Sequence, residues 1–374
     1  MNSAPGSEIY IGLMSGTSLD GVDVAIVDFA EFPPLLLHTS TTSYTESIRR
    51  RLRQLCQSQS TSLAELYSLD VELGELYAGV VNQALETASL DRNRIAALGS
   101  HGQTISHSPD GAVAFTAQIG DPARLATRCG ITTVADFRRK DIALGGQGAP
   151  LAPAFHRFLF HSGNEDRAVI NIGGIANITW LPTDQDAAML GFDTGPGNTL
   201  LDYWIEKHRS QPFDDGGDWA RGGRVIDSLL DEMIAAEKYF ASKAPKSTGT
   251  EYFGPDWLAG YLREQHDARD VQATLLELTT HTIADAISGL PSAAVKCFVC
   301  GGGAHNRFLL ERLRHLLPQC GVTTTASLGL DPNYVEAVAF AWLARERLNL
   351  RNGNIPEVTR ARRGTILGAI YTGE

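Results

Sequence analysis

The stretch Ile11-Gly12-Leu13-Met14-Ser15-Gly16-Thr17-Ser18-Leu19-Asp20-Gly21-Val22-Asp23 decides the fold of this 374-residue chain. The apolar residues 9–14 predict a strand, and alternating apolar residues over 22–29 predict a second strand directly after the glycine turn. A Rossmann fold would place a helix straight after its first glycine loop. The stretch therefore predicts a β-hairpin whose turn is rich in glycine and hydroxyl groups.

The same pattern returns in the second half of the chain. A strand at 169–172 breaks at Gly173-Gly174 and is followed by another strand at 177–181, again with no helix between them. Two halves that open with the same hairpin predict a duplicated α/β architecture with an interdomain cleft, of the actin-like (ribonuclease H-like) type. We expect a first domain over residues 1–138 and a second over 139–362, with 363–374 as a candidate return to the first.

Other local signals fill in the two halves. Ser62 and Glu65 form a capping box before a long amphipathic helix, and Asp121-Pro122 predicts a helix start. A strand is expected at 188–192, another at 295–300, a helix from 305 to 316, and a long apolar helix at 334–348.

Composition narrows the class of protein. Lys and Arg number 32 against 43 Asp and Glu, and this net charge of −11 argues against a nucleic-acid or anionic-membrane surface. No apolar run approaches the roughly 20 residues that a membrane span requires, and the N-terminus does not resemble a signal peptide. The five scattered cysteines fit a reducing cytoplasm. Cys297 and Cys300 are interpreted as core residues of a strand rather than as a redox or zinc pair.

Glycine-rich turns between strands direct several backbone N–H groups into one concavity, which suits phosphate oxygens. One such turn can equally be an ordinary tight hairpin, but this chain has three glycine clusters, at 16–21, 173–174 and 301–303. No Gly-Lys pair occurs, so a Walker A loop is excluded, and Asn306 stands where a dinucleotide fingerprint needs glycine. The remaining layout is that of an actin-like ATPase. Asp20 could orient Mg²⁺ through water.

Six blocks of sequence resemble those of the anhydro-N-acetylmuramic acid kinases. Besides 11–23, they are Ser100-His101-Gly102-Gln103-Thr104, Ala135-Asp136-Phe137-Arg138, Asn171-Ile172-Gly173-Gly174-Ile175-Ala176-Asn177, Gly191-Phe192-Asp193-Thr194-Gly195-Pro196-Gly197-Asn198 and Cys300-Gly301-Gly302-Gly303-Ala304-His305-Asn306. Asn171 stands where the wider actin-like superfamily often has Asp, which weakens any claim of metal binding there.

The resemblance implies an ATP site with Mg²⁺ and distributes it over the three glycine clusters. The ATP-binding residues it implies are Gly16, Thr17, Ser18, Leu19, Asp20, Gly21, Val22, Asp23, Gly173, Gly174, Gly301, Gly302 and Gly303. Residues 16–23 would contact the phosphates, and 301–303 would lie by the nucleoside.

Two carboxylates are candidates for the chemistry. Asp193 follows an apolar strand and precedes a glycine–proline turn, so from the residues alone it is either a general base facing the cleft or a cap of the turn or next helix. Glu336, on the helix 334–348, is either a solvated helix position or a functional acid. The resemblance makes Asp193 the catalytic base and Glu336 a second catalytic carboxylate that helps to hold water or sugar.

Four residues are candidates for substrate binding: His101, Gln103, Asp136 and Arg138. Arginine presents a fork that grips a carboxylate through two hydrogen bonds, so Arg138 is assigned to the lactyl carboxylate of the implied substrate. His101 and Gln103 follow a strand and could bond sugar or N-acetyl groups.

The implied reaction hydrolyses the 1,6-anhydro ring of 1,6-anhydro-N-acetylmuramic acid and phosphorylates O6 with ATP, as a cytoplasmic step of peptidoglycan recycling. Relatives suggest a homodimer. Two alternatives stay open: an actin-like kinase or phosphatase for another small acceptor, and a non-catalytic nucleotide switch that binds protein partners.

Overall fold

The computed structural model describes residues 7–16, 18–58, 60–292 and 294–373, and it forms two compact units. Unit 1 contains the chain up to Phe155 and again from Tyr334, and unit 2 contains His156–Asn333. Compared with the expected division after residue 138 and return at 363, unit 1 also contains residues 139–155 and 334–362. The helix that carries Glu336 therefore belongs to the same unit as the first glycine turn.

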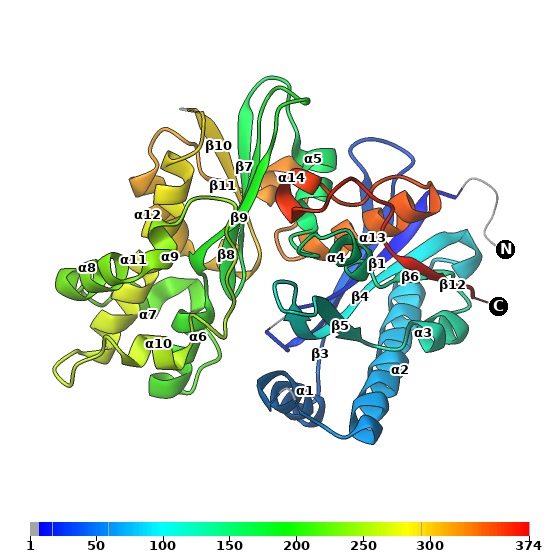
Figure 1. Cartoon of the computed structure of the whole chain (residues 1–374), viewed down its shortest axis with the longest axis horizontal. Coiled ribbons are helices and arrows are strands. Elements are labelled where there is room, and N and C mark those ends of the chain that lie inside the picture. Colours follow the sequence, from blue (N-terminus) through cyan, green and yellow to red (C-terminus); the bar gives the residue numbers. More distant parts are fainter. Residues whose placement is uncertain (1–6, 17, 59, 293, 374) are drawn as a thin grey trace. The chain divides into compact units, whose positions relative to one another are not determined.

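Unit 1 is built on a seven-stranded mixed sheet in the order β12-β6-β4-β1-β2-β3, with β5 paired to β4 (Figure 1). Its strands are β1 Ile9–Ser15, β2 Gly21–Asp28, β3 Leu35–Ser43, β4 Ile95–Ser108, β5 Phe115–Ile119, β6 Thr133–Ala135 and β12 Ala369–Tyr371. β1 and β2 form the predicted antiparallel hairpin, whereas β1 pairs with β4, and β4 with β6, in parallel. The carboxyl ends of β1, β4 and β6 therefore lie at one edge of the sheet.

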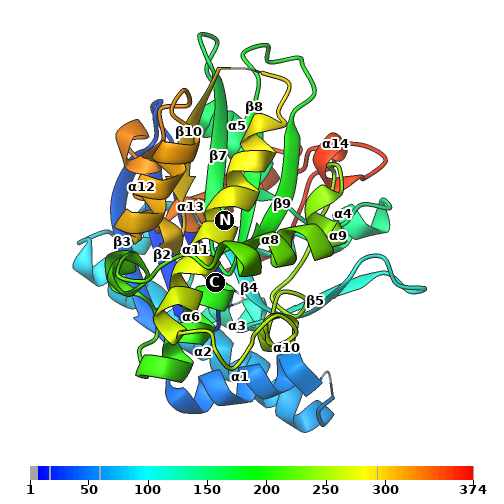
Figure 2. The same ribbon diagram turned by 90° about the vertical axis from the view of Figure 1, so that its left-hand side faces the viewer.

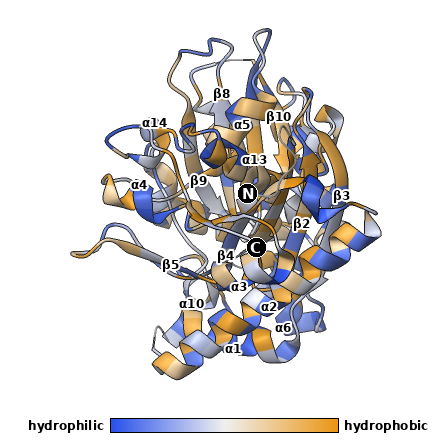
Figure 3. Ribbon diagram, turned by 90° about the vertical axis from the view of Figure 1, so that its right-hand side faces the viewer, coloured by the Kyte–Doolittle hydropathy of each residue, from blue (hydrophilic) through white to orange (hydrophobic). Residues whose placement is uncertain are grey.

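The helices of unit 1 are α1 Glu46–Ser58, α2 Leu63–Thr87, α3 Pro122–Cys129, α4 Arg139–Ala143, α13 Val335–Leu348 and α14 Pro356–Thr359, and α5 Ala152–Phe160 contains the division between the units. Of these helices, α2, α3 and α13 start where the sequence signals predict. The Ser62 hydroxyl accepts a hydrogen bond from the Glu65 N–H at 3.1 Å, which caps α2. α1 was not predicted; hydrophobic and hydrophilic residues alternate along it in Figure 3, and Ile48 and Leu52 are its buried residues.

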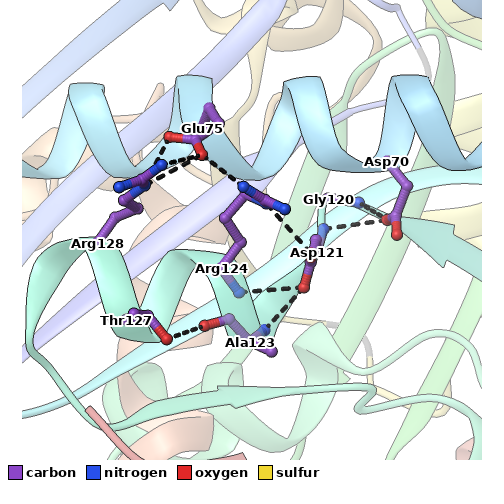
Figure 4. Close-up of polar contacts among 8 residues, drawn as sticks. All are labelled: Asp70, Glu75, Gly120, Asp121, Ala123, Arg124, Thr127 and Arg128. Atoms are coloured by element: carbon purple, nitrogen blue, oxygen red, sulfur yellow. Dashed lines mark hydrogen bonds and ion pairs between the residues drawn. The ribbon is translucent and has the colours of Figure 1, made fainter. Parts of the chain in front are cut away.

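Polar side chains fasten α3 to α2 beside the sheet, as Figure 4 shows. Asp121 caps α3 by accepting from the N–H groups of Ala123 and Arg124, while Asp70 of α2 accepts from the N–H of Gly120 at 2.7 Å. Glu75 of α2 binds the guanidinium groups of Arg124 and Arg128 at 2.9 and 3.0 Å. These contacts fix the two helices around the buried apolar face of α2.

Helix α13 packs backbone to backbone on the first sheet because two paired strand positions are glycine. Gly12 of β1 and Gly99 of β4 are direct partners in the ladder. A Cβ on Gly12 would lie 1.8 Å from the carbonyl oxygen of Ala337, and one on Gly99 would lie 2.0 Å from that of Phe340. No side chain fits at either position, so the two glycines determine how closely α13, and with it Glu336, approaches the strands.

Unit 2 is built on a five-stranded sheet in the order β11-β10-β7-β8-β9. Its strands are β7 Asp166–Ile172, β8 Ile175–Leu181, β9 Leu190–Pro196, β10 Val295–Cys300 and β11 Thr323–Thr324. β7 and β8 form the second predicted hairpin; β10 is parallel to β7, and β9 is antiparallel to β8. The carboxyl ends of β7, β9 and β10 therefore share one edge.

The helices of unit 2 are α6 Thr199–Arg209, α7 Asp218–Arg221, α8 Asp227–Ala236, α9 Lys238–Ala241, α10 Pro255–Ala259, α11 Ala268–Ser288 and α12 Arg307–Leu316. The long helix α11, yellow in Figure 2, lies against the sheet and contacts β8 and β9. It was not predicted. Within the described residues no helix combines the length and apolar character that crossing a bilayer requires.

Several boundaries differ from those predicted. The strand expected at 188–192 continues as β9 to Pro196, so Asp193 lies inside a strand rather than after one. The helix expected from residue 305 begins at Arg307, after a 3-10 turn at Gly302–His305. The C-terminal strand β12 pairs with β6 of unit 1. Cys297 and Cys300 are buried in β10.

Candidate active site

The first glycine turn follows β1 at the carboxyl edge of the unit 1 sheet. Ser18 and Asp20 are exposed, whereas Leu19 is buried and adopts a left-handed φ of 59° that turns the chain back toward β2. Gly21 begins β2 against β3, where a Cβ would meet the carbonyl oxygen of Thr42 at 2.2 Å. Thr17 lies outside the described residues. The turn is therefore anchored by one apolar side chain and presents polar groups outward.

Gln103, predicted to bind substrate, is hydrogen-bonded to the start of this turn. Its side chain is fully buried; Oε1 accepts from the Ser15 hydroxyl at 2.6 Å, and Nε2 donates to the carbonyl oxygen of Gly16 at 3.1 Å. The Tyr44 hydroxyl contacts the hydroxyl group of Ser15, and it lies 2.8 Å from the hydroxyl group of Tyr77. The amide of Gln103 is thus engaged by the chain itself, and its contact with substrate stays a prediction.

His101 and Arg138 form a pair at the same edge. The His101 Nε2 accepts from Arg138 Nε at 3.1 Å and from Nη2 at 2.9 Å. Because an arginine donates only, Nε2 must carry the lone pair, so the proton is on Nδ1, which donates to the carbonyl oxygen of Ser15 at 3.1 Å. Burial, reinforced by the charge of Arg138, lowers the pKa of His101 to about 3. His101 is therefore a neutral ring of fixed orientation.

Arg138 is held by one further hydrogen bond. Its Nη1 donates to the carbonyl oxygen of Gly148 at 2.8 Å. Burial lowers the pKa of Arg138 to about 10, opposed by the charges of Glu336 and Asp141, so the guanidinium remains charged at neutral pH. Three of its five N–H groups have partners among the described residues, which leaves two for a ligand.

Asp136 adopts a left-handed backbone conformation, with a φ of 57°, at the turn that follows β6. Burial raises the pKa of its carboxyl, while Arg139, 3.6 Å away, lowers it. The unusual backbone turns the chain between β6 and Arg138, so Asp136 contributes to the placement of that guanidinium.

Glu336 occupies the first turn of α13, partly exposed. Burial raises the pKa of its carboxyl; the positive charge of Arg138 opposes this shift, and the negative charge of Asp23 adds to it. Asp23 of β2 accepts from the Thr41 hydroxyl at 2.6 Å, and burial, with a smaller contribution from Asp20, raises its pKa. Glu336, Arg138 and Asp23 thus interact electrostatically within unit 1.

The carboxylates of unit 1 suit a magnesium ion that arrives bound to phosphate. Among the described residues there is no group of three or more His, Cys, Asp or Glu that could enclose a metal. Mg²⁺ in nucleotide sites keeps several waters and needs only one or two carboxylates besides the phosphates. Exposed Asp20, with Asp23 close enough to feel its charge, fits that requirement.

The second glycine turn, between β7 and β8, is packed against the start of α6. The carbonyl oxygen of Gly173 accepts from the N–H of Asn198 at 2.8 Å, and that of Gly174 accepts from Gly197 at 2.8 Å. A Cβ on Gly197 would lie 2.3 Å from the carbonyl oxygen of Gly173. The backbone of the hairpin turn therefore packs directly on the backbone at the end of β9.

The third glycine cluster adjoins the second because β10 lies beside β7. Gly301 has a φ of 77°, and a Cβ on it would lie 2.4 Å from Asn171 Oδ1. A Cβ on Gly303 would lie 2.4 Å from Cγ2 of Ile172, and one on Gly302 would be 3.6 Å from Nδ2 of Asn198. The second and third predicted glycine clusters thus meet at the carboxyl edge of the unit 2 sheet.

Asp193 lies at the same edge, where β9 is irregular. The register with β8 shifts between Gly195, opposite Ala176, and Asp193, opposite Asn177, so that one extra residue re-aims the side chain. Asp193 Oδ2 accepts from the Thr248 N–H at 2.9 Å. Burial raises the pKa of Asp193 to about 6, against the lowering effects of Thr248 and Lys246. A carboxylate of this pKa is suited to accept a proton near neutral pH.

The comparisons with known proteins agree with the six sequence blocks. The family model described as anhydro-N-acetylmuramic acid kinase matches residues 8–373. The chain belongs to this family. An anhydro-N-acetylmuramic acid kinase of Coxiella burnetii is 48% identical over 368 residues, covering 98% of each chain. That of Pasteurella multocida is 49% identical over 369 residues, covering 98% of this chain and 97% of its own.

Membership confirms the predicted resemblance, and with it the class of sugar kinase. The observed α/β units, each with an opening hairpin and a mixed sheet, agree with the two-domain ATPase fold predicted from the sequence. The predicted site residues divide between the two units. Among the described residues, unit 1 contains Gly16, residues 18–23, His101, Gln103, Asp136, Arg138 and Glu336, and unit 2 contains Gly173, Gly174, Asp193 and Gly301–Gly303.

Sequence analysis missed the residues that hold these groups. The carbonyl oxygen of Gly148 accepts from Arg138, and the N–H of Thr248 donates to Asp193. Both residues lie in segments without periodic apolar residues, so the sequence pattern provided no signal for them. Glycines inside apolar strands were a usable signal for Gly12 and Gly99, because a strand glycine often marks a close backbone approach.

Proposed function

We propose that this protein uses ATP to phosphorylate 1,6-anhydro-N-acetylmuramic acid with opening of its anhydro ring, yielding N-acetylmuramic acid 6-phosphate and ADP. The proposal places it in the cytoplasm, in peptidoglycan recycling, as a homodimer. Family membership supports the substrate, since the relatives bear that name. The observation that carries the chemistry is the Asp193 carboxyl at the carboxyl edge of the second sheet, with its pKa raised to about 6.

The proposed reaction needs one base. Asp193 accepts a proton from water as the water oxygen attacks C1 of the sugar. The C1–O6 bond breaks, and O6 takes the γ-phosphoryl group, so that the bond to the β-phosphate oxygen breaks and ADP leaves. Water on the far face of the sugar is the arrangement of an inverting glycosidase, except that phosphorus rather than a proton captures the leaving oxygen.

The nucleotide would be held mostly by backbone. We assign the phosphates to residues 16–23 and to Gly173 and Gly174, and the nucleoside to Gly301–Gly303, where close packing keeps side chains out of the way. Mg²⁺ bound to the phosphates would be oriented by Asp20 through water, and its charge would offset the negative charge that develops during transfer.

The sugar would be bound by the side chains of unit 1. The two remaining N–H groups of Arg138 match the two oxygens of the lactyl carboxylate. His101 keeps that guanidinium oriented, and Asp136 sets the turn before it. Glu336, whose charge interacts with Arg138, would help to hold the attacking water or a sugar hydroxyl.

The test is ADP release from ATP in the presence of the anhydro sugar, with ordinary hexosamines as competing acceptors. We expect ADP release with the anhydro sugar but not with the hexosamines. The sugar product should be heavier than the anhydro sugar by one phosphoryl group and one water. Turnover of hexosamines instead would favour a kinase for another acceptor. Nucleotide binding without turnover of any sugar would favour the alternative of a non-catalytic nucleotide switch that binds protein partners.

A further inference from the structure

We propose that Lys246 and Tyr239 are positioning residues for the carboxylate of Asp193, and that the buried Glu237 fastens the segment that carries them. The inference rests on the proposed role of Asp193 as base, and it assigns to this segment the orientation and the acidity of that base.

Asp193 is contacted on three sides by residues 239–248. Its N–H donates to the carbonyl oxygen of Lys246 at 3.1 Å, and its own carbonyl oxygen accepts from the Tyr239 hydroxyl at 2.8 Å. Its Oδ2 accepts from the Thr248 N–H at 2.9 Å. Among the described residues Oδ1 has no hydrogen-bond partner, so this carboxylate oxygen is left for water while the rest of the residue is fixed.

The ammonium group of Lys246 is placed to act on this carboxylate by its charge. Its Nζ donates to the carbonyl oxygens of Tyr239 at 3.0 Å and Phe240 at 3.3 Å, and it lies 4.5 Å from the centre of the Tyr239 ring. Burial lowers the pKa of Lys246 and Asp193 opposes that shift, so the two charges interact.

Among the described residues, the other side chains around Asp193 that follow are neutral. β8 places Asn177 opposite it, and α11 brings Thr279 and Thr282 against the end of β9, where the Thr279 hydroxyl donates to the carbonyl oxygen of Pro196. Tyr239 is titratable, but burial and the nearby Asp193 raise the pKa of its hydroxyl, so it stays protonated. Lys246 is thus the cation of unit 2 that lowers the pKa of Asp193.

Glu237 gives the segment a fixed starting point. It is buried and accepts from the N–H of Tyr239 at 2.8 Å, from the Tyr252 hydroxyl at 3.0 Å and from the Trp257 indole at 2.9 Å. Phe240 stacks on Phe253 with ring centres 5.4 Å apart. Glu237 at the cap of α9 and the Phe240–Phe253 stack therefore fix the segment, with Tyr239 inside the short helix and Lys246 in the chain that follows it.

The segment also reaches the second glycine turn. A Cβ on Gly174 would lie 3.0 Å from Cγ2 of Thr250, two residues after the contact of Thr248 with Asp193. The same stretch of chain therefore touches both the base and the turn assigned to phosphate.

The test compares the pH dependence of kcat/KM for the anhydro sugar in the full-length enzyme and in three lysine variants. We expect Lys246→Met to move the acid limb to higher pH, because the positive charge of Lys246 lowers the pKa of Asp193 and its removal raises that pKa. Lys246→Arg should keep the limb near its original position. The control is Lys243→Met, an exposed lysine three residues earlier, which should leave the limb unmoved. An unmoved limb in Lys246→Met would overturn the role of its charge.

Tyr239→Phe tests the positioning independently of charge and with almost no change in shape. We expect kcat to fall several-fold while the KM for ATP and the acid limb stay unchanged, and an unchanged kcat would overturn the role of Tyr239. If Lys246→Met fails to fold, Tyr239→Phe still tests whether the segment positions Asp193. Asp193→Asn in the same assay separates the two proposals. Activity in Asp193→Asn would show that Asp193 is not the base. If Asp193→Asn is inactive and the acid limb of Lys246→Met is unmoved, Asp193 remains the proposed base and only the role of Lys246 is overturned.

Discussion

The two carboxyl edges of the molecule hold their functional groups in different ways. In unit 1, charged and polar side chains bond to one another and to the first glycine turn, as His101 does to Arg138 and Gln103 to Ser15. In unit 2, glycine backbones pack on each other and Asp193 is held by main-chain groups of a neighbouring segment. In unit 1 a network of side chains therefore fixes the candidate binding groups, whereas in unit 2 the backbone fixes a single carboxylate, the proposed base.

The strongest test of this comparison removes the reactive group from unit 2. Asp193→Asn keeps the shape and the Thr248 contact but cannot accept a proton, so we expect kcat to fall roughly 10²–10⁴-fold, the usual contribution of a general base. The KM for ATP should hardly change. Asp231→Asn on the exposed face of α8 is the matched control. Steady-state kinetics with near-native kcat in Asp193→Asn would show that unit 2 does not supply the base.

A smaller effect is expected when the network of unit 1 is altered. Arg138→Lys keeps the charge but cannot bond His101, Gly148 and a carboxylate together, so the KM for the sugar should rise about 10- to 100-fold, as for a lost charge-assisted hydrogen bond. The KM for ATP should stay within a factor of about two. Exposed Arg139→Lys next to it should change neither value. Equal losses for both substrates would mean that Arg138 does not belong to the sugar side.

Sequence signals predicted the parts of each edge that depend on local chemistry. Both glycine hairpins and the caps at Ser62 and Asp121 follow from neighbouring residues alone. Helix α11 escaped prediction because buried polar residues interrupt its apolar pattern; they are Gln272, Thr274, Glu277, Thr279, Thr280 and Thr282.

Non-local pairing explains the remaining differences. The register shift that re-aims Asp193 arises between β8 and β9, and the packing of α13 depends on Gly12 and Gly99, which are far apart in sequence. Of the candidate substrate-binding residues, His101 and Gln103 were expected in a loop after a strand but lie inside the longer strand β4. Their hydrogen bonds required strands β1, β4 and β6 to be adjacent.

The glycine contact beneath α13 can be tested through stability. Gly99→Ala places a methyl group where the carbonyl oxygen of Phe340 lies, and such overpacking typically costs about 1–3 kcal/mol of unfolding free energy. Gly79→Ala on the exposed face of α2 has open space and should stabilise by up to about 1 kcal/mol, because alanine is the better helix former. Urea denaturation measures both. Equal effects of the two substitutions would contradict the close approach of α13 to the sheet.

The smallest expected effect concerns the pH dependence of folding stability, because unit 1 contains a buried histidine, His101, that stays neutral. The pKa of His101 is lowered to about 3 in the folded protein, whereas an unfolded histidine titrates near 6.5. As pH falls below 6.5 the unfolded chain binds this proton and the folded chain does not, so folding stability decreases by up to about 1.4 kcal/mol per pH unit from this group. His101→Gln should remove that part of the slope, while exposed His315→Gln should not. Urea titrations between pH 7 and 5 give the slopes directly. If His101→Gln keeps the full slope, the histidine is protonated in the folded state, and it could then no longer accept from Arg138.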